Sequence, residues 1–270
     1  MSTPNPVVND NVRLLAVLVD PDDTDESEYR FLVDGRHVKY VTVAPGVLPK
    51  DDRTFAPVLV PSLPPFPSGD WNEGHISKDA QTGKPTFASV KKSDLSGVKN
   101  TWHRTVIDHL EFRQLDKLRQ NIHKVAHPFF DEPVLVKFAL FPWQISFLEA
   151  ETTAYQWIDG SGIGPKSLGH VAEEGRVIGF VMEYIDGARA TPDDLGACQR
   201  ALAELHALGI KHGDINRHNF VVQQGGEAVL IDFEAAGRGK TREELDAEYL
   251  RLEDELKDLS GRGGVVGGGQ

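Results

Sequence analysis

The chain has only one cysteine, Cys198, among its 270 residues. This excludes an intramolecular disulfide framework and a multi-cysteine metal cluster, and it fits a reducing compartment. No run of about 18 apolar residues, the length that spans a membrane, occurs in the sequence. The first ten residues, MSTPNPVVND, lack the basic start and apolar core of a signal peptide. We therefore expect a cytoplasmic protein, with the nucleus as the alternative, that is neither secreted nor membrane-spanning.

Positive charge is also scarce. The chain has 29 lysines and arginines against 41 acidic residues, a formal net charge of -12. A nucleic-acid binder or a reader of acidic membrane surfaces needs positive surface to meet phosphate. We therefore expect neither nucleic acid nor membrane as a partner, and an anionic ligand would need a local site. The remaining composition is that of a soluble globular protein with one large or two small domains.

Residues 1–100 are rich in strand and turn signals. The segment NVRLLAVLVD is typical of a strand, and EYRFLVDGRHVKYVTV predicts a hairpin that turns at Asp34-Gly35. Seven of the 16 prolines lie between Pro45 and Pro67, and a stretch with many turn formers follows. We interpret residues 1–100 as a β-rich, proline-rich extension that continues, after the hairpin, as an extended arm or irregular subdomain. A protein partner could bind through it.

From about residue 101 the pattern indicates regular elements. PVLVKFAL and GRVIGFVMEYI predict buried strands, and PWQISFLEAETTAYQWI predicts a helix with Pro142 in its first turn. Thr191 and Gly209 mark the beginning and end of a second helix. Thr241 and Glu244 form the capping box of a third. Its expected apolar stripe consists of Leu245, Tyr249, Leu252, Leu256 and Leu259. The last residues, SGRGGVVGGGQ, predict a mobile tail.

Two polar motifs lie at the ends of a predicted hairpin. KHGDINRHNF (211–220) leads into the first strand, Gly225-Gly226 forms the turn, and AVLIDFEAA (228–236) contains the second strand. The hairpin should bring Asp214, Asn219 and Asp232 together. Carboxylate and amide oxygens gathered in this way suit Mg²⁺ better than zinc. The sequence therefore predicts a site for a metal-bound phosphate.

These motifs carry a family resemblance. HGDINRHN resembles the catalytic loop H-R-D-x-x-x-x-N of protein kinases, and IDFE resembles their D-F-G. Gly213 in place of the arginine and Glu234 in place of the glycine are similar to the small-molecule branch of this superfamily, the aminoglycoside phosphotransferases and choline kinases. The resemblance covers about residues 120–236. It implies ATP as phosphoryl donor and Mg²⁺ as cofactor.

The resemblance also implies roles for individual residues. Asp214 would be the catalytic base that orients an acceptor hydroxyl, Asn219 and Asp232 would bind Mg²⁺, and His212 would be a structural member of the loop. The alternative is an Asx-rich turn in which these side chains cap their own backbone.

A kinase-like site further implies a lysine–glutamate pair upstream. Lys137, in VLVKF, stands where the lysine of V-A-I-K would be. On the following helix, Glu151 falls within the apolar arc, whereas Glu149 points away from it. A carboxylate inside an apolar stripe needs a partner, so we expect Glu151 to pair with Lys137 and to hold it against the phosphates. The alternative is a solvated glutamate and a lysine at a strand edge.

The segment VMEYIDG resembles a kinase hinge. Met182 would line the adenine pocket, and the backbone of Glu183, Tyr184 and Ile185 would bind the edge of the base. A buried strand that ends in a turn is the alternative.

Two other motifs are set aside. GSGIGPKS is similar to a phosphate-binding loop, but Pro165 lacks the N–H that would bind phosphate, so a turn before the next strand is favoured. His123 and His127, in HKVAH, have ligand-like spacing without a glutamate between them or a third ligand. An ordinary surface or strand pair is the better interpretation.

Three features depart from the kinase pattern. No glycine lies between Gly97 and Gly160, so the glycine-rich loop over the phosphates is missing or replaced within LDKLRQNIHKVAHP. Only 38 residues follow Asp232, fewer than an activation segment and a complete large lobe require. Asn216 stands where many protein kinases have a lysine, and Arg217 is a candidate to supply that charge.

We therefore expect an α+β, two-lobed kinase-like fold: the extension, an N-lobe over 101–185, a reduced C-lobe over 186–260 and a flexible tail over 261–270. The predicted function is ATP- and Mg²⁺-dependent phosphoryl transfer to a hydroxyl of an unidentified, small-molecule acceptor. The first alternative is a pseudokinase, a nucleotide-binding or protein-interaction module without catalysis. A distant alternative is a glycoside hydrolase that uses two of the 41 acidic residues as acid and base.

Overall fold

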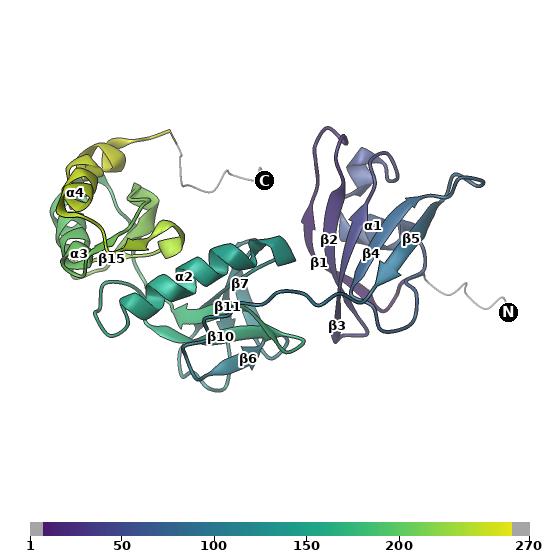
Figure 1. Cartoon of the computed structure of the whole chain (residues 1–270), viewed down its shortest axis with the longest axis horizontal. Coiled ribbons are helices and arrows are strands. Elements are labelled where there is room, and N and C mark those ends of the chain that lie inside the picture. The colour runs from purple at the N-terminus through teal and green to yellow at the C-terminus, as the bar shows by residue number, and fades with distance from the viewer. Residues whose placement is uncertain (1–7, 261–270) are drawn as a thin grey trace. The chain divides into compact units, whose positions relative to one another are not determined.

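A computed structural model describes residues 8–260, so the expected tail over 261–270 lies outside the described residues. The chain divides into two compact units, Met1–Ser96 and Gly97–Gln270. Each unit contains helix and multi-stranded sheet, which makes the chain α+β, a class consistent with a kinase-like fold (Figure 1). Across residues 8–260, none of the helices combines the length and the apolar character needed to cross a membrane.

The first unit is a five-stranded sheet with one helix. Its strands, in the spatial order β1-β2-β3-β4-β5, are β1 (Val12–Leu18), β2 (Ser27–Val33), β3 (His37–Val43), β4 (Glu73–Lys78) and β5 (Pro85–Lys91). All neighbours are antiparallel except β3 and β4, whose parallel pairing requires a crossover. The crossover contains a 3₁₀ turn (Lys50–Asp52) and α1 (Ala56–Ser62). The predicted hairpin is confirmed, because Asp34 and Gly35, at φ 55° and 68°, form the turn between β2 and β3.

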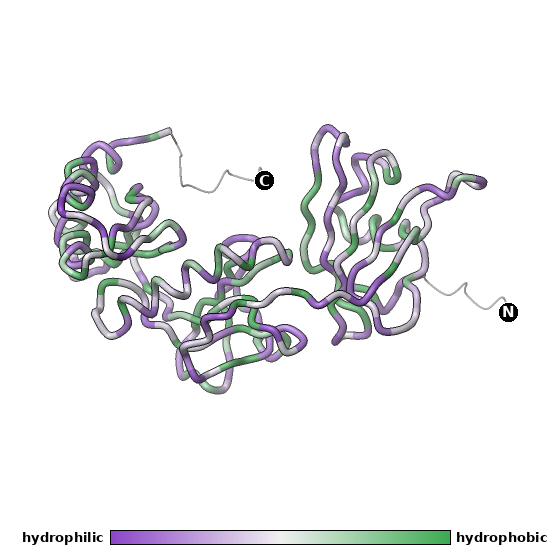
Figure 2. The backbone as a smooth tube through the Cα atoms, in the orientation of Figure 1, coloured by the Kyte–Doolittle hydropathy of each residue, from purple (hydrophilic) through white to green (hydrophobic). Residues whose placement is uncertain are grey.

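The expectation of an extended arm or irregular subdomain after this hairpin is wrong. Trp71 and Ile76 are buried in the same core as Tyr29, Phe31 and Leu59 of the preceding elements. Apolar residues that stand isolated among turn formers in the sequence meet in space, and Phe66, Trp71 and Phe87 form an aromatic cluster with ring centroids 5.3–5.9 Å apart. Figure 2 shows the turn between β4 and β5 as hydrophilic, although ordered strands flank it. Composition alone therefore makes this region look less ordered than it is.

The second unit begins with a six-stranded sheet. In the spatial order β6-β10-β11-β9-β8-β7, its strands are β6 (Val106–Asp108), β10 (Ser167–Glu173), β11 (Arg176–Glu183), β9 (Val134–Phe138), β8 (Ile122–Ala126) and β7 (Arg113–Arg119). Helix α2 (Ile145–Trp157), which follows a 3₁₀ turn at Pro142–Gln144, packs against β11 (Figure 1). The two strands and the helix predicted here are confirmed, and the GSGIGPKS segment forms the turn before β10.

The rest of the second unit is built on α3 (Leu195–Ala207) and α4 (Arg242–Lys257), which pack against each other. Short strands accompany them. β12 (Ala188–Arg189), which precedes α3, forms one sheet with β14 (Phe220–Val222) and β15 (Ala228–Leu230), and β13 (Ile210–Lys211) pairs with β16 (Gly237–Arg238). 3₁₀ turns lie at Pro192–Asp194, Arg217–Asn219 and Phe233–Ala235. The predicted capping box of Thr241 and Glu244 is present, and Thr191, the predicted N-cap, forms a second capping box with Asp194. Leu259 does not belong to the apolar stripe, because α4 ends at Lys257 and this side chain is exposed.

Candidate active site

Lys137 joins three elements of the second unit. It lies on β9, between Ile122 of β8 and Phe180 of β11. Its Nζ lies 2.6 Å from Oε2 of Glu151 on α2 and 2.7 Å from Oδ1 of Asp232, which follows β15. The lysine–glutamate contact expected from helix geometry is therefore present, and the same lysine also holds Asp232.

Glu149, the rejected alternative, accepts a hydrogen bond from the backbone N–H of Asn100 at 3.0 Å. Its carboxylate is thus engaged outside the cluster of Lys137, Glu151 and Asp232. The choice between the two glutamates followed from which helix face is apolar.

The electrostatics of this cluster are dominated by burial. Glu151 is 1% exposed, and burial raises the pKa of Glu151 to about 7 against the opposing attraction of Lys137. Burial alone would lower the pKa of Lys137, but the charges of Glu151 and Asp232 outweigh it and raise this pKa. Burial likewise opposes the ionisation of Asp232, yet Lys137 and Arg119 hold its pKa below the ordinary value. Lys137 and Asp232 are therefore the stable ion pair, and Glu151 titrates near neutrality.

Asp214 and Asn219 lie side by side in the loop before β14. Asn219 Nδ2 donates to the backbone carbonyl of Asp214 at 2.9 Å and to its Oδ2 at 3.0 Å. The N–H of Ile231 donates to the carbonyl of Asn219 at 3.0 Å, which ties the loop to the end of β15. Asn216, which was not among the residues of the Asx-turn alternative, accepts from the N–H of His218 and caps the 3₁₀ turn. Asn219 bonds the backbone of its own loop, as that alternative expects, and it also fixes the Asp214 carboxylate.

Gly213, which replaces the kinase arginine, has a local structural cause. Its φ is +87°, a conformation that favours glycine, and an added Cβ would lie 2.3 Å from the carbonyl oxygen of Ala235. The loop therefore approaches the segment after Asp232 too closely for a side chain at this position.

Asp232 turns the chain toward the cluster. Its φ of 66° is left-handed, which is uncommon for a residue with a side chain and costs on the order of 1–3 kcal/mol. The next residue, Phe233, is fully buried, with ring centroids 5.3 Å from Tyr155 and 5.0 Å from His212. This packing holds the strained backbone, so that Asp232 faces Lys137 while Phe233 enters the core.

Oxygen ligands for a divalent cation gather at this turn. Asn219 and Asp232, the predicted ligands, line one cavity, and one carboxylate oxygen each of Glu151, Asp232 and Glu234 lie within 4.8 Å of one another. A donor set made only of oxygen suits Mg²⁺. The residues present therefore fit the ion. Glu234 is a further ligand candidate, which the sequence marks only as the residue that replaces the glycine of D-F-G.

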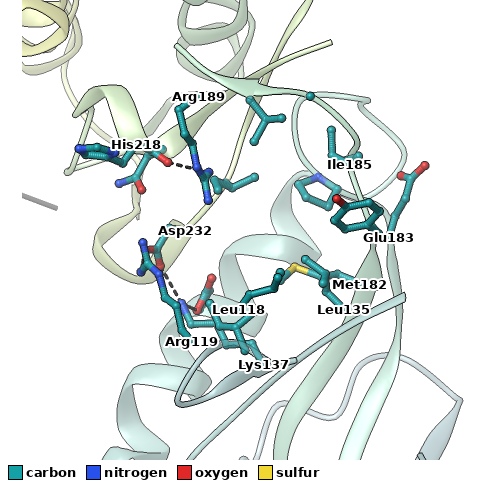
Figure 3. Close-up of a pocket in the computed structure, with 18 residues that line it drawn as sticks. Leu118, Arg119, Leu135, Lys137, Met182, Glu183, Ile185, Arg189, His218 and Asp232 are labelled. Carbon is teal, nitrogen blue, oxygen red and sulfur yellow. Dashed lines mark hydrogen bonds and ion pairs between the residues drawn. The ribbon is translucent and has the colours of Figure 1, made fainter. Parts of the chain in front are cut away.

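A cavity of about 290 Å³ opens beside the cluster (Figure 3). Lys137, Glu151, Asn219 and Asp232 line one part of it. The predicted hinge residues line another, and these are Met182, Glu183, Tyr184 and Ile185. Leu118, Ile122, Leu135, Val221 and Ile231 add apolar surface. The cavity thus offers an apolar region for a flat ring and a polar region for an anion with its cation.

Asp214 does not line this cavity. It lines a second hollow of about 310 Å³ together with Phe147, Asp232, Glu234 and Ala235. Asp232 therefore borders both spaces.

Two arginines of the cavity escaped the sequence analysis. Arg119, the last residue of β7, places Nη1 3.9 Å from Oδ2 of Asp232. Arg189, on β12, donates from Nη1 to the carbonyl of His218 at 2.8 Å. Partial removal of the Arg189 guanidinium from water and repulsion from Arg119 lower the pKa of Arg189. Arg217, the candidate chosen from sequence, is not among the residues that line either space.

A buried glutamate that no sequence signal marked supports the loop from behind. Glu248 of α4 is 0% exposed and accepts from the N–H of His212 at 2.9 Å and of Gly213 at 2.7 Å. His206 Nε2 lies 2.8 Å from the same carboxylate. His212 is itself buried and bonds the carbonyl of Ile231 at 3.1 Å, consistent with the structural role expected for it.

Comparison with known proteins points to kinases. The model of the lipopolysaccharide kinase (Kdo/WaaP) family matches residues 185–257. The chain is 35% identical over 103 residues to a probable bifunctional tRNA threonylcarbamoyladenosine biosynthesis protein of Methanothermobacter thermautotrophicus, a match that covers 36% of this chain and 19% of that protein. It is 30% identical over 103 residues to 3-deoxy-D-manno-octulosonic acid kinase of Xanthomonas campestris, covering 29% of this chain and 40% of the relative. The matches thus span less than half the length of these relatives.

These similarities agree with the motifs on the level of the superfamily. They support a kinase-like phosphotransferase and define no finer family, since each covers well under half of this chain. The segment that the family model matches contains the hinge end, the Asp214 loop and Asp232.

Proposed function

We propose that the second unit binds ATP with Mg²⁺ in the 290 Å³ cavity and transfers a phosphoryl group to a hydroxyl of a small acceptor. The cavity would lie between two lobes, residues 101–185 and 186–260. One observation carries the proposal: Lys137 is held by both Glu151 and Asp232 at one part of a cavity whose other part is formed by the predicted hinge.

Each residue has a chemical task in this proposal. The backbone of Glu183 to Ile185 would bind the base edge, and Lys137, positioned by Glu151, would bind the α- and β-phosphates. Asn219 and Asp232 would hold Mg²⁺, which neutralises phosphate charge when bound.

Asp214 would orient the acceptor hydroxyl and accept its proton. The hydroxyl oxygen forms a bond to the γ-phosphorus while the bond from this phosphorus to the oxygen of ADP breaks. The Asn219 hydrogen bond to Asp214 supports this role, because it fixes the carboxylate in place.

A sugar or another small polyol is the acceptor class that the comparisons favour. One relative is named for phosphorylating a sugar acid, and the matched family is named for lipopolysaccharide. The 310 Å³ hollow at Asp214 is the space in which such an acceptor would bind.

Nucleotide binding without catalysis is the second candidate. The observation that favours it is the strand β7 and its turn into β8, which line the cavity without any glycine.

A thermal-shift titration with ATP, with and without Mg²⁺, tests the proposed site. ATP bound at about 100 times its Kd stabilises the native state by about 2.7 kcal/mol, enough to raise the melting temperature by several degrees. We expect this rise in the wild type to depend on Mg²⁺ and to be lost in Asp232→Ala and Lys137→Ala. Asp246→Ala, on the exposed face of α4, is the control. A wild-type protein that shows no shift at millimolar ATP would contradict the proposal.

A further inference from the structure

The hairpin formed by β7 and β8 borders the cavity where phosphates would bind. Leu118, Arg119 and Ile122, at the turn of this hairpin, line the cavity. A glycine-rich loop brings backbone N–H groups close to phosphate because it has no side chains in the way. This hairpin contains no glycine, so a side chain must supply any contact with an anion from this side.

Arg119 is placed to make that contact. The other residues of β7 are exposed, whereas the Arg119 side chain is 30% exposed and points toward Asp232 and Lys137 (Figure 3). Its Nη1 lies 3.9 Å from Asp232, a distance at which charges attract but no hydrogen bond forms. Within residues 8–260 the Arg119 guanidinium makes no side-chain hydrogen bond, so its donors remain able to bind an oxyanion.

Arg189 approaches the cavity from the other side. Its bond to the carbonyl of His218 fixes the guanidinium, and Figure 3 shows Arg189 and Arg119 on opposite sides of Asp232. Together with Lys137, three cations line this space, and so do the acidic residues Glu151, Glu183 and Asp232. Lys137 is already held by Glu151 and Asp232, so the two arginines are the cations that can face an added anion. Like charges that face each other across a cavity repel, and an anion between them removes that repulsion.

We propose that Arg119, opposed by Arg189, is the phosphate clamp of this cavity and replaces the glycine-rich loop. The Arg119 guanidinium would bind two non-bridging oxygens of the β- or γ-phosphate through its planar fork. The 3.9 Å contact with Asp232 would then give way, because Asp232 turns to Mg²⁺ as the phosphates arrive. The clamp rests on the proposed ATP site.

The test separates phosphate binding from base binding. Thermal shifts with ATP and Mg²⁺, with ADP and Mg²⁺, and with adenosine alone are measured for the wild type, Arg119→Ala and Arg119→Lys. Arg113→Ala, at the exposed beginning of the same strand, is the matched control. We expect Arg119→Ala to weaken ATP binding by about 10- to 100-fold, the range for a lost charge-assisted bidentate contact, while the adenosine shift is unchanged.

Arg119→Lys should recover part of the ATP affinity, because it keeps the charge but not the fork. Arg189→Ala should weaken ATP binding less than Arg119→Ala. An unchanged adenosine shift shows that a variant is folded. If the wild type binds ATP and Arg119→Ala binds it within about twofold of Arg113→Ala, the clamp is wrong and the ATP site stands. If the wild type binds no nucleotide, both are wrong.

Discussion

Glu151 is the acidic residue of the site whose ionised form its surroundings stabilise least. It is buried, and it competes with Asp232 for the single ammonium group of Lys137. A buried acid that shares its cation keeps its proton to a higher pH than an exposed one. The stability of the second unit should therefore depend on pH through this side chain.

We expect the Glu151→Gln variant to reveal that dependence. An unfolded glutamate loses its proton near pH 4.5, whereas folded Glu151 keeps it up to about pH 7. Between these values the folded state binds more protons, so this group's contribution to wild-type stability is present below pH 4.5 and is lost as the pH rises through 7. The free energy of unfolding of Glu151→Gln minus that of the wild type should then grow with pH by on the order of 1–3 kcal/mol.

Denaturant unfolding at several pH values from about 4.5 to about 8 measures this difference. Glu149→Gln, on the same helix but bonded to the backbone of Asn100, is the matched control. If the two variants follow the same pH profile, burial does not raise the pKa of Glu151.

At this scale, local patterns predicted some contacts and missed others. The Lys137–Glu151 contact could be predicted because the period of a helix decides which glutamate shares the apolar face. Arg119 could not, because β7 is exposed along nearly its whole length and shows no alternation. Glu248 could not either, since a glutamate among other acids of an amphipathic helix carries no sign that it will meet the N–H groups of a loop 35 residues away.

Helix α4 supports the loop that carries Asp214. The fully buried carboxylate of Glu248 accepts the N–H groups of His212 and Gly213 and contacts the ring of His206. These bonds tie the loop to α4. The helix is therefore part of the positioning of Asp214 although it lines neither hollow.

The substitution Glu248→Gln tests this support. The amide keeps the shape but turns one acceptor into a donor that faces a backbone N–H, so we expect a loss of about 1–3 kcal/mol in stability. ATP turnover should fall more than ATP affinity, because the substitution loosens the loop that carries Asp214 and leaves the hinge that binds the base unchanged. Thermal melting and turnover measure the two effects, with Glu243→Gln in the exposed first turn of the same helix as control. Equal behaviour of the two variants would mean that α4 does not position the loop.

Among the elements, those with strong local signals were predicted correctly. Neighbouring residues determine turns with positive φ, helix caps and apolar helix faces. These local signals predicted the β2–β3 and β14–β15 hairpins and helices α2, α3 and α4. Helix α1 and strands β4 and β5 depend on long-range packing of Leu59, Trp71 and Phe87. Proline and turn formers dominate their local sequence, so the order of this region was missed.

The whole chain has two units, and each buries hydrophobic residues of its own. The candidate site lies entirely within the second unit. We expect calorimetry of the full chain to resolve two transitions, of which only one moves when ATP and Mg²⁺ are added. Leu59→Ala, in the core of the first unit, should lower the melting temperature of only the transition that ATP does not move. The reason is that replacing a fully buried leucine by alanine costs about 2–5 kcal/mol of stability.

A single transition that shifts as a whole with ATP would show that the two units unfold together. In that case the first unit would contribute to the stability of the site.

The most direct measurement of the central claim is ADP formation from ATP and Mg²⁺, with water as the acceptor, by the wild type and by Asp214→Asn. The asparagine keeps the size of the side chain but cannot take the proton of the attacking water. A general base contributes about 10²- to 10⁴-fold to a rate, so we predict a loss of at least about 100-fold with ATP affinity unchanged. Equal turnover by the two proteins, at unchanged affinity, would contradict phosphoryl transfer at Asp214 and leave a cavity that only binds nucleotide.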